Sequence, residues 1–343
     1  MLIAIIILAM IILIILSALL ILKNDPGYII DFLKKNPTRS SICIIRNDEV
    51  IISAGEKRLM PLASTVKIMI ALAYTNQVSK GLLVNTEMID LDKIKNFYLP
   101  GTDAGAHNSW LNELNQKELI QNNSVPLDEV VKGMIKFSSN ANAEYLLSKI
   151  KKENIEASIT EAGIVNHTAI YPFVSSLIVS AKHPGTTGQE LIDKSWEYHE
   201  KIKQCDDQVV KSFKTPDLKV QKTWSDHLPA STTKDYCVLM NAVNTGKLFD
   251  KKAGLHVREI LEWPPINKSL FTSFGIKGGS TAFIVTEALY ATDASGNSMA
   301  LAIFFNDLKD WERIIIDWTL SKFEIKFILN EKFRNKVRKE LSG

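Results

Sequence analysis

The chain has 343 residues, of which 46% are hydrophobic and 23% are charged. This profile is typical of a globular protein with a sizeable core, built as one large domain or two modest ones. A net charge of only +3 gives no footprint of a nucleic-acid partner. Cys43, Cys205 and Cys237 lie far apart, which excludes a disulfide framework and a metal-ligand spacing but not a single disulfide. We expect them to be small buried apolar side chains.

The first element is an apolar run from Leu2 to Leu22 in which Ser17 is the only polar side chain. As a helix it would reach roughly 30 Å, enough to cross a bilayer core. The run lacks a basic n-region and is longer than the apolar part of a cleaved signal. We therefore expect residues 1–23 to be an uncleaved transmembrane signal-anchor and residues 24–39 to be a linker with a short helix.

Helix and hairpin signals follow the anchor. The stretch "GYIIDFLKKNP" predicts a short amphipathic helix that ends before Pro37. In residues 41–59 two β-branched runs flank "RNDE", which is a hairpin signature. The stretch "STVKIMIALAYTNQVSKG" predicts a buried helix closed by Gly81. Residues 82–121 are polar and irregular and include "YLPGTDAGAHNSW", whose Pro and Gly content predicts an ordered loop.

Helical patterns dominate the middle of the chain. Residues 126–150 predict two helices with a break at "SSN". Residues 154–225 are charged and mixed, with a surface helix expected at "GQELIDKSWEYHEKIKQ". The stretch "STTKDYCVLMNAVNTGKLF" begins with a strong N-cap run and predicts another helix.

The chain closes with strands and a helix. Residues 269–292 and 298–307 predict strands separated by the turn "DASGN", and "DWERIIIDWTLSKFEIKFI" predicts a final helix before a basic tail. Strands from opposite ends of the chain can pair in one sheet, with the middle inserted as a helical lobe. We expect an α+β domain over residues 40–343, with an antiparallel sheet flanked by helices and an all-helical lobe at about residues 69–231. A crevice between sheet and lobe would be the natural ligand site.

Ser64 and Lys67 are the first candidate pair for chemistry. Residues three apart on a helix share a face, and a serine hydroxyl needs an adjacent base to become a nucleophile. A desolvated lysine near another cation has a lowered pKa and can accept that proton. The helix N-terminus would also offer free N–H groups to an oxyanion. The alternative is a capping serine followed by a lysine that extends along the surface.

Two further motifs strengthen this interpretation. Ser138 and Asn140 lie at a break between two apolar helices, where an ordinary turn is the alternative. Lys277 lies in a strand and is followed by Gly278 and Gly279, which let a ligand backbone approach closely. An edge-strand lysine beside a bulge is the alternative there. All three motifs in this order are a far less frequent coincidence than any one alone.

Together the motifs resemble the Ser-x-x-Lys, Ser-x-Asn and Lys-Thr-Gly set of class A β-lactamases and penicillin-binding proteins. The resemblance runs from about Ser40 to the C-terminus and is weakest between Asn154 and Ser225. It implies a β-lactamase/transpeptidase-like fold and an acyl-serine mechanism. The implied roles follow. Ser64 is the acylated nucleophile, Lys67 its base or proton relay, Ser138 the proton donor to the departing nitrogen, Asn140 the group that orients Lys67 and the substrate amide, and Lys277 the partner of the substrate carboxylate that also polarises Ser138.

The third motif departs from the family pattern. Gly278 replaces the usual hydroxyl residue, so one hydrogen bond to the substrate carboxylate is missing, and either Ser280 or Thr281 could replace it. The resemblance implies an oxyanion hole made by the backbone N–H groups of Ser64 and Ser280. It also places Gly278, Gly279, Ser280, Thr281 and, on a loop beside the cleft, His107 at the substrate; His107 could instead hydrogen-bond its own loop.

Deacylation is a separate problem. Class A β-lactamases use a glutamate on a loop between the second and third motifs, often within Glu-x-x-Leu-Asn. Here the corresponding stretch, "PFVSSLIVSAKHPG", has no acidic residue. Without a base for water, the acyl-enzyme should persist. Substitutes by residue type, most of which a solvated helix face also explains, are Glu190, Asp193, Glu197, Glu200, Asp226 and His227.

The leading interpretation is a membrane-anchored β-lactamase-like serine hydrolase acting on β-lactams or related D-alanyl amides. A D-Ala-D-Ala peptidase with slow deacylation is the close alternative, and a non-turnover protein that binds a β-lactam or a cell-wall fragment is the second. We expect no cofactor, because the histidines show no ligand spacing, and no metal. Lys23, Lys34, Lys35 and Arg39 after the span weakly favour a cytoplasmic domain, but the chemistry favours a single-pass protein with its domain outside the cytoplasm. The oligomeric state stays open.

Overall fold

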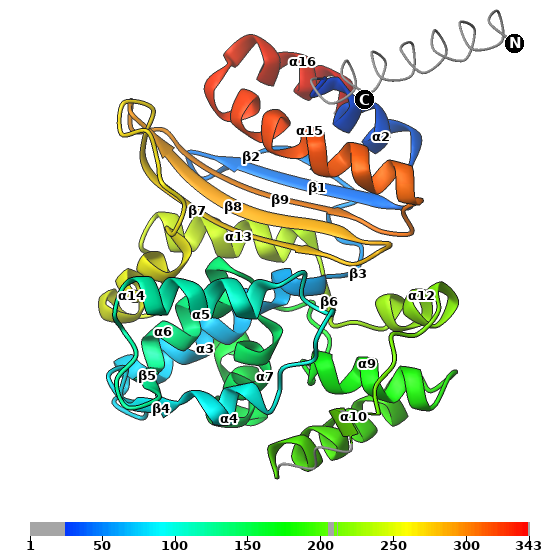
Figure 1. Cartoon of the computed structure of the whole chain (residues 1–343). Coiled ribbons are helices and arrows are strands. Elements are labelled where there is room, and N and C mark those ends of the chain that lie inside the picture. The colour runs from blue at the N-terminus through cyan, green and yellow to red at the C-terminus, as the bar shows by residue number, and fades with distance from the viewer. Residues whose placement is uncertain (1–24, 205–208, 211, 342–343) are drawn as a thin grey trace, which may run out of the picture.

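The computed structural model describes residues 25–204, 209–210 and 212–341 (Figure 1). The expected anchor at residues 1–23 and Cys205 lie outside this part of the chain. Within the described part, no helix has both the length and the apolar character needed to span a bilayer. Cys43 and Cys237 are buried and carry free thiols, in line with the expectation of small interior side chains.

One five-stranded antiparallel sheet joins the two ends of the chain. Its order is β2-β1-β9-β8-β7. From one edge to the other, the strands are β2 (Glu49–Ala54), β1 (Ser40–Arg46), β9 (Ser298–Phe305), β8 (Val285–Asp293) and β7 (Phe271–Ser280). Strand β1 pairs with β9 from Ser40↔Phe305 to Arg46↔Met299. The predicted pairing of strands from opposite ends is therefore confirmed, and β7 is left as a free edge.

The predicted hairpin is confirmed at β1 and β2. Its turn residues Asn47 and Asp48 both have positive φ, 50° and 65°. Asn and Asp tolerate this left-handed conformation, and two such residues give the hairpin turn whose twist matches the strands.

Helices cover both faces of the sheet (Figure 1). One face packs against α2 (Gly27–Lys35), α15 (Asp310–Leu329) and α16 (Glu331–Leu341), and the other against α13 (Thr233–Asn244). The basic tail of the sequence is thus helical: α16 buries Phe333 and Val337, four residues apart, and turns its charges outward. This amphipathic spacing was hidden by the high charge of the segment.

The helical lobe is built around α3 (Lys67–Ser79), which is buried from Lys67 to Val78. Its apolar neighbours on all sides explain why the segment shows no amphipathic stripe. The helices that contact α3 are α6 (Leu127–Lys136), α7 (Asn140–Ile150), α8 (Lys152–Glu161) and α14 (Lys251–Leu261). The lobe therefore includes a helix that lies beyond the expected limit of residue 231.

The remaining helices form the outer part of the lobe. They are α4 (Leu91–Lys95), α5 (Ala106–Gln116), α9 (Phe173–Lys182), α10 (Gly188–Lys203) and α12 (Leu218–Asp226). Short pairs of strands, β3 (Met60–Pro61) with β6 (Ala230–Ser231) and β4 (Met88–Asp90) with β5 (Ser124–Pro126), connect these parts. The helix expected at residues 188–204 is confirmed as α10. The segment expected to be a loop contains α5, which buries only His107, Trp110 and Leu114 and so shows a thin apolar stripe.

Candidate active site

Ser64 lies on a short 3₁₀ helix, η1 (Ala63–Val66), between the edge strand β7 and the start of α3. Ala63 has a positive φ of 45°, a conformation that costs a non-glycine residue on the order of 1 kcal/mol. The turn presents Ser64 to the cavity, while Thr65 and Val66 point into the interior. The sequence predicted an α-helix here, but α3 begins only at Lys67.

Lys67 is fully buried, and its ammonium group has three hydrogen-bond acceptors. Nζ lies 2.6 Å from the Ser138 carbonyl oxygen, 2.7 Å from Asn140 Oδ1 and 3.3 Å from Ser138 Oγ. Burial and the nearby positive charge of Lys277 lower the pKa of Lys67 well below its usual value. A lowered pKa makes the neutral amine that a base needs easier to form. Lys67 Nζ makes no hydrogen bond to the Ser64 hydroxyl among the described residues. Hydrogen bonds between a nucleophile and its base are often long in a free enzyme and tighten when substrate binds.

Ser138 lies between the two lysines. It has a positive φ of 65° at the break between α6 and α7, which turns its hydroxyl toward both ammonium groups. Lys277 Nζ donates to Ser138 Oγ over 3.0 Å and to the Gly278 carbonyl oxygen over 2.5 Å. Burial lowers the pKa of Lys277 to about 8. The structure therefore brings Lys67, Ser138 and Lys277, from three distant segments, into one hydrogen-bonded array.

Asn140 ties this array to the loop before α5. Its Oδ1 accepts from Lys67, and its Nδ2 donates to the Thr102 carbonyl oxygen over 3.2 Å. The next residue, Asp103, accepts from the backbone N–H groups of Gly105 and His107. Sequence reasoning missed Thr102 and Asp103, because a backbone carbonyl and a loop-capping carboxylate leave no motif.

Gly279 is required by the close packing of β7 against η1. A Cβ at this position would lie 2.5 Å from Ser64 N and 2.6 Å from Thr65 N. Thr286, opposite Gly279 on β8, donates to the Leu62 carbonyl oxygen over 2.7 Å and fixes the same contact. The nucleophile is thus positioned by the sheet as well as by its own helix.

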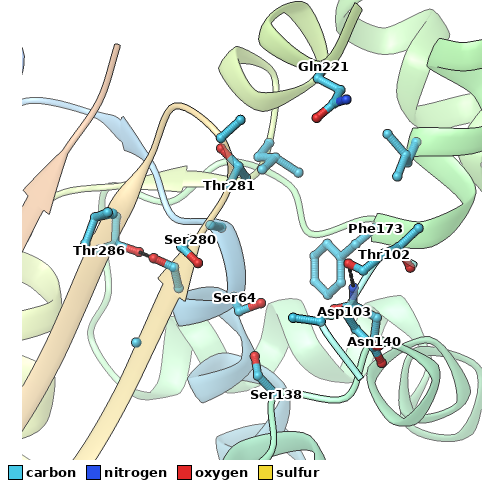
Figure 2. A pocket seen from close by; sticks show the side chains of 18 of the residues that line it. Ser64, Thr102, Asp103, Ser138, Asn140, Phe173, Gln221, Ser280, Thr281 and Thr286 are labelled. Atoms are coloured by element: carbon cyan, nitrogen blue, oxygen red, sulfur yellow. Dashed lines mark hydrogen bonds between the residues drawn. The ribbon is translucent and has the colours of Figure 1, made fainter. Parts of the chain in front are cut away.

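These groups open on a cavity of about 700 Å³ (Figure 2). In Figure 2, Ser64 lies between Ser138 and Ser280, with the Phe173 ring facing it across the space. The predicted site residues among its lining are Ser64, Ser138, Asn140, Gly278, Gly279, Ser280 and Thr281. The Thr281 hydroxyl accepts from Ser225 Oγ at 3.0 Å and from Phe283 N at 3.1 Å, so it also holds the turn after β7.

His107 is the predicted substrate contact that the structure places elsewhere. Its side chain is buried and does not line the cavity. The ring stacks on Tyr98 with centroids 4.8 Å apart, and Nδ1 lies 3.4 Å from Ser139 Oγ. The reason is that residues 106–116 form a helix rather than an open loop, and this helix turns His107 inward.

The wall opposite the lysines is apolar. Phe173, Val174 and Leu177 of α9 line it. A buried glutamate holds this wall: Glu144 accepts from Val174 N over 2.7 Å and pairs with His199 Nδ1 over 2.8 Å. The segment "PFVSSLIV" therefore does reach the cavity, but it brings no acid.

The acids proposed as substitute bases lie away from this wall. Those on α10 and α12 face solvent in local ion pairs, such as Glu197 with Lys201 and Asp226 with Lys222. His227 is exposed and contacts the Thr223 carbonyl oxygen. None of the six candidates lines the cavity. In the described part of the chain, no group of three or more His, Cys, Asp or Glu could hold a metal ion.

Comparisons with known proteins identify a matching family and several similar folds. The model of the Beta-lactamase enzyme family matches residues 28–314. A beta-lactamase from Chitinophaga pinensis is 15% identical, with a TM-score of 0.56 over 88% of this chain and 99% of that one. A class A beta-lactamase from Bacteroides cellulosilyticus is 17% identical, with a TM-score of 0.55 over 89% of this chain and 97% of that one. A PBP-A mutant in an acyl-enzyme complex with penicillin G is 14% identical, with a TM-score of 0.56 over 89% and 95%. A search of curated proteins finds no match.

Proposed function

Because the chain belongs to the Beta-lactamase enzyme family, we propose that it is a serine hydrolase that forms an acyl-enzyme at Ser64. The observation that carries this proposal is the Lys67–Ser138–Lys277 array, in which Ser138 lines the same cavity as Ser64 and the two buried lysines lie behind it. A nucleophile, a depressed-pKa amine and a proton-donating hydroxyl are the parts that acyl transfer needs.

Acylation would proceed in two proton transfers. Ser64 Oγ attacks the carbonyl carbon and gives its proton to the neutral amine of Lys67. The bond from that carbon to nitrogen then breaks, and Ser138 Oγ donates its proton to the departing nitrogen. The Lys277 ammonium lies 3.0 Å from Ser138 Oγ, so it stabilises the alkoxide and can restore the proton. The backbone N–H groups of Ser64 and Ser280 would hold the oxyanion.

The substrate class follows from the family and from charge. A β-lactam or a D-alanyl amide presents a carbonyl next to a breakable nitrogen bond, and its carboxylate would pair with Lys277. The PBP-A relative is described as an acyl-enzyme complex with penicillin G, which supports a β-lactam as the first probe for this chain.

Slow deacylation favours the peptidase-type alternative over an efficient β-lactamase. The wall across from the lysines is lined by Phe173, Val174 and Leu177 and offers no general base to a water molecule. Of the acids that do line the cavity, Asp103 is committed to two backbone N–H groups. Glu287 lies on β8 and Asp317 on α15, which packs against β8.

We propose that residues 1–23 anchor the protein in the cell membrane as a single span, with the domain outside the cytoplasm. The apolar run from Leu2 to Leu22 supports the anchor, and a cell-wall or β-lactam substrate supports the orientation.

The test is intact-protein mass spectrometry of the purified full chain with benzylpenicillin, followed over time. We expect the mass of one penicillin to be added to the wild type, peptide mapping to locate it at Ser64, and the adduct to last for many minutes. Ser64→Ala should remain unmodified. An absence of any adduct on the folded wild type would contradict the proposal, and rapid turnover would favour a β-lactamase. If Ser64→Ala retained the protein's biological effect, non-turnover binding would be the better interpretation.

A further inference from the structure

The cavity continues past Gly278 to the other side of the edge strand. Beyond this glycine it is lined by Glu287 of β8 and by Asp317, Leu320 and Ser321 of α15. These residues lie on the face of the sheet that packs against α15, opposite the face that holds Ser64. We refer to this extension, lined by Gly278, Glu287, Asp317, Leu320 and Ser321, as the acidic annex.

Strand geometry explains how the annex opens. Side chains alternate along a strand, so Lys277 and Gly279 face η1 while Gly278 faces α15. Gly278 pairs with Glu287 across the β7–β8 ladder. A Cβ on Gly278 would lie only 3.2 Å from Glu287 Oε2. The missing side chain therefore leaves the Glu287 carboxyl group uncovered toward a ligand that lies along β7.

Behind Glu287 lies a second acid with an unused oxygen. Glu324 is 2% exposed and is seven residues after Asp317 on α15, so both lie on the helix face toward β8. The carboxyl groups of Glu324 and Glu287 interact across the packing of α15 on β8. Glu324 Oε1 is buried and has no hydrogen-bond partner among the described residues. A buried acceptor without a donor is costly, and a donor brought to the two carboxyl groups through the cavity at Glu287 would relieve that cost.

The other charged side chains nearby do not supply this hydrogen-bond donor. Asp317 lies at the rim and pairs with Arg313 over 2.9 Å. Lys277 acts on Glu287 only through space, because its own donors go to Ser138 and Gly278. Burial raises the pKa of both glutamates. Among the described residues, no basic side chain contacts either carboxyl group directly, so an added positive charge would favour ionisation of the pair.

We propose that the acidic annex is a subsite for a primary ammonium group on the departing part of the acyl donor, bound by Glu287 with Glu324 behind it. Ser138 and Lys277 mark the leaving-group side of the cavity, and Gly278 is the next residue along the strand. A second carboxylate there would meet a like charge. A metal ion is disfavoured by the donor set, since Glu287 and Glu324 supply only two ligating groups. This inference rests on the proposed acylation of Ser64.

The test uses two β-lactams that differ in one substituent beside the ring nitrogen, a primary ammonium in one and a hydroxyl in the other. Acylation of the full chain is followed by intact mass. We expect the wild type to react with the ammonium probe about tenfold faster or more, as a charge-assisted hydrogen bond implies. Glu287→Gln should reduce this ratio to near one. The ratio cancels any change in Lys277, because both probes depend on it equally. Glu331→Gln, an exposed glutamate on α16, is the matched control and should keep the wild-type ratio.

The Gly278→Ser variant is a second, independent test. Its added side chain should cover Glu287 and lower the ratio as well, even if Glu287→Gln folds poorly. Equal rates for the two probes on the wild type would overturn the annex while leaving the acylation of Ser64 intact. A wild-type ratio that both variants keep would also overturn it. If neither probe modified the folded wild type, the proposed function would fail, and the annex as a substrate subsite would fail with it.

Discussion

The two walls of the cavity differ in what they supply. On the side of η1, α7 and β7, Lys67, Ser138, Asn140 and Lys277 form one hydrogen-bonded array beside Ser64. On the side of α9, the lining is Phe173, Val174 and Leu177, and the polar groups behind it face away from the cavity toward Glu144. In the proposed mechanism, the first wall carries out acylation. The second offers little to a water molecule that would hydrolyse it, so the two half-reactions depend on different parts of the fold.

The largest expected effect comes from removing the amine on the polar wall. Lys67→Met keeps the volume of the side chain but cannot accept the Ser64 proton, so we expect acylation by benzylpenicillin to slow by about 10³- to 10⁴-fold. The measurement is the rate of adduct formation by intact mass. Lys80→Met, at the exposed lysine that directly follows α3, should react like the wild type. A Lys67→Met protein that acylated normally would show that another group is the base.

The next largest expected effect is faster deacylation after a carboxylate is added to the apolar wall. Phe173→Glu places a carboxylate where the ring now faces Ser64 (Figure 2), and we expect the lifetime of the penicillin adduct to fall by about 10²-fold. Phe173→Gln, which has the same shape without a base, is the control. If both variants shortened the lifetime equally, the cause would be looser packing rather than general-base catalysis, and the contrast between the walls would be wrong.

A third effect concerns the support of that wall. Glu144→Gln should lower the free energy of unfolding by about 2 kcal/mol, because the bonds from His199 and Val174 to a buried carboxylate are lost or weakened. Denaturant unfolding measures this change. Glu190→Gln, at an exposed helix position, is the comparison and should stay within about 0.5 kcal/mol of the wild type. An equally small change for Glu144→Gln would remove its assigned role.

The smallest expected effect is a fall in the acylation rate at high pH, caused by Lys277 of the polar wall. The ammonium of Lys277 has a pKa lowered to about 8 and is needed in its charged form. The charge is present below this pKa and is lost as the pH rises through it, so the acylation rate should fall above about pH 8, by up to tenfold per unit. Lys277→Arg should shift this fall in rate to higher pH. An unchanged fall in that variant would assign it to another group.

The polar wall was largely predictable from the sequence, and the apolar wall was not. Ser64 with Lys67, Ser138 with Asn140, and Lys277 before two glycines are short local patterns, and the structure brings them together. The helix α9 and its anchor depend on Glu144 and His199, which are 55 residues apart, so no local pattern reveals them. His107 shows the limit of transferring a loop by resemblance, since α5 turned its ring inward.

The acidic annex could not be predicted from the sequence either. Gly278 was visible as a departure from the family motif, but its meaning depends on the opposite strand and on α15. Glu287 and Glu324 carry no motif and look like ordinary strand and helix residues. Only the register of β7 against β8 and the face of α15 bring them together.

The pairing of β1 with β9 has a consequence for biosynthesis. Residues 40–46 find their partners only at residues 298–305, after most of the chain has left the ribosome. Contacts of such long sequence separation form late and slow the search for the native topology. The 3₁₀ helix η1 packs against β7, which belongs to the same sheet and is also made late. The geometry around Ser64 therefore forms only when the sheet is complete, so a nascent or truncated polypeptide would hold no reactive serine.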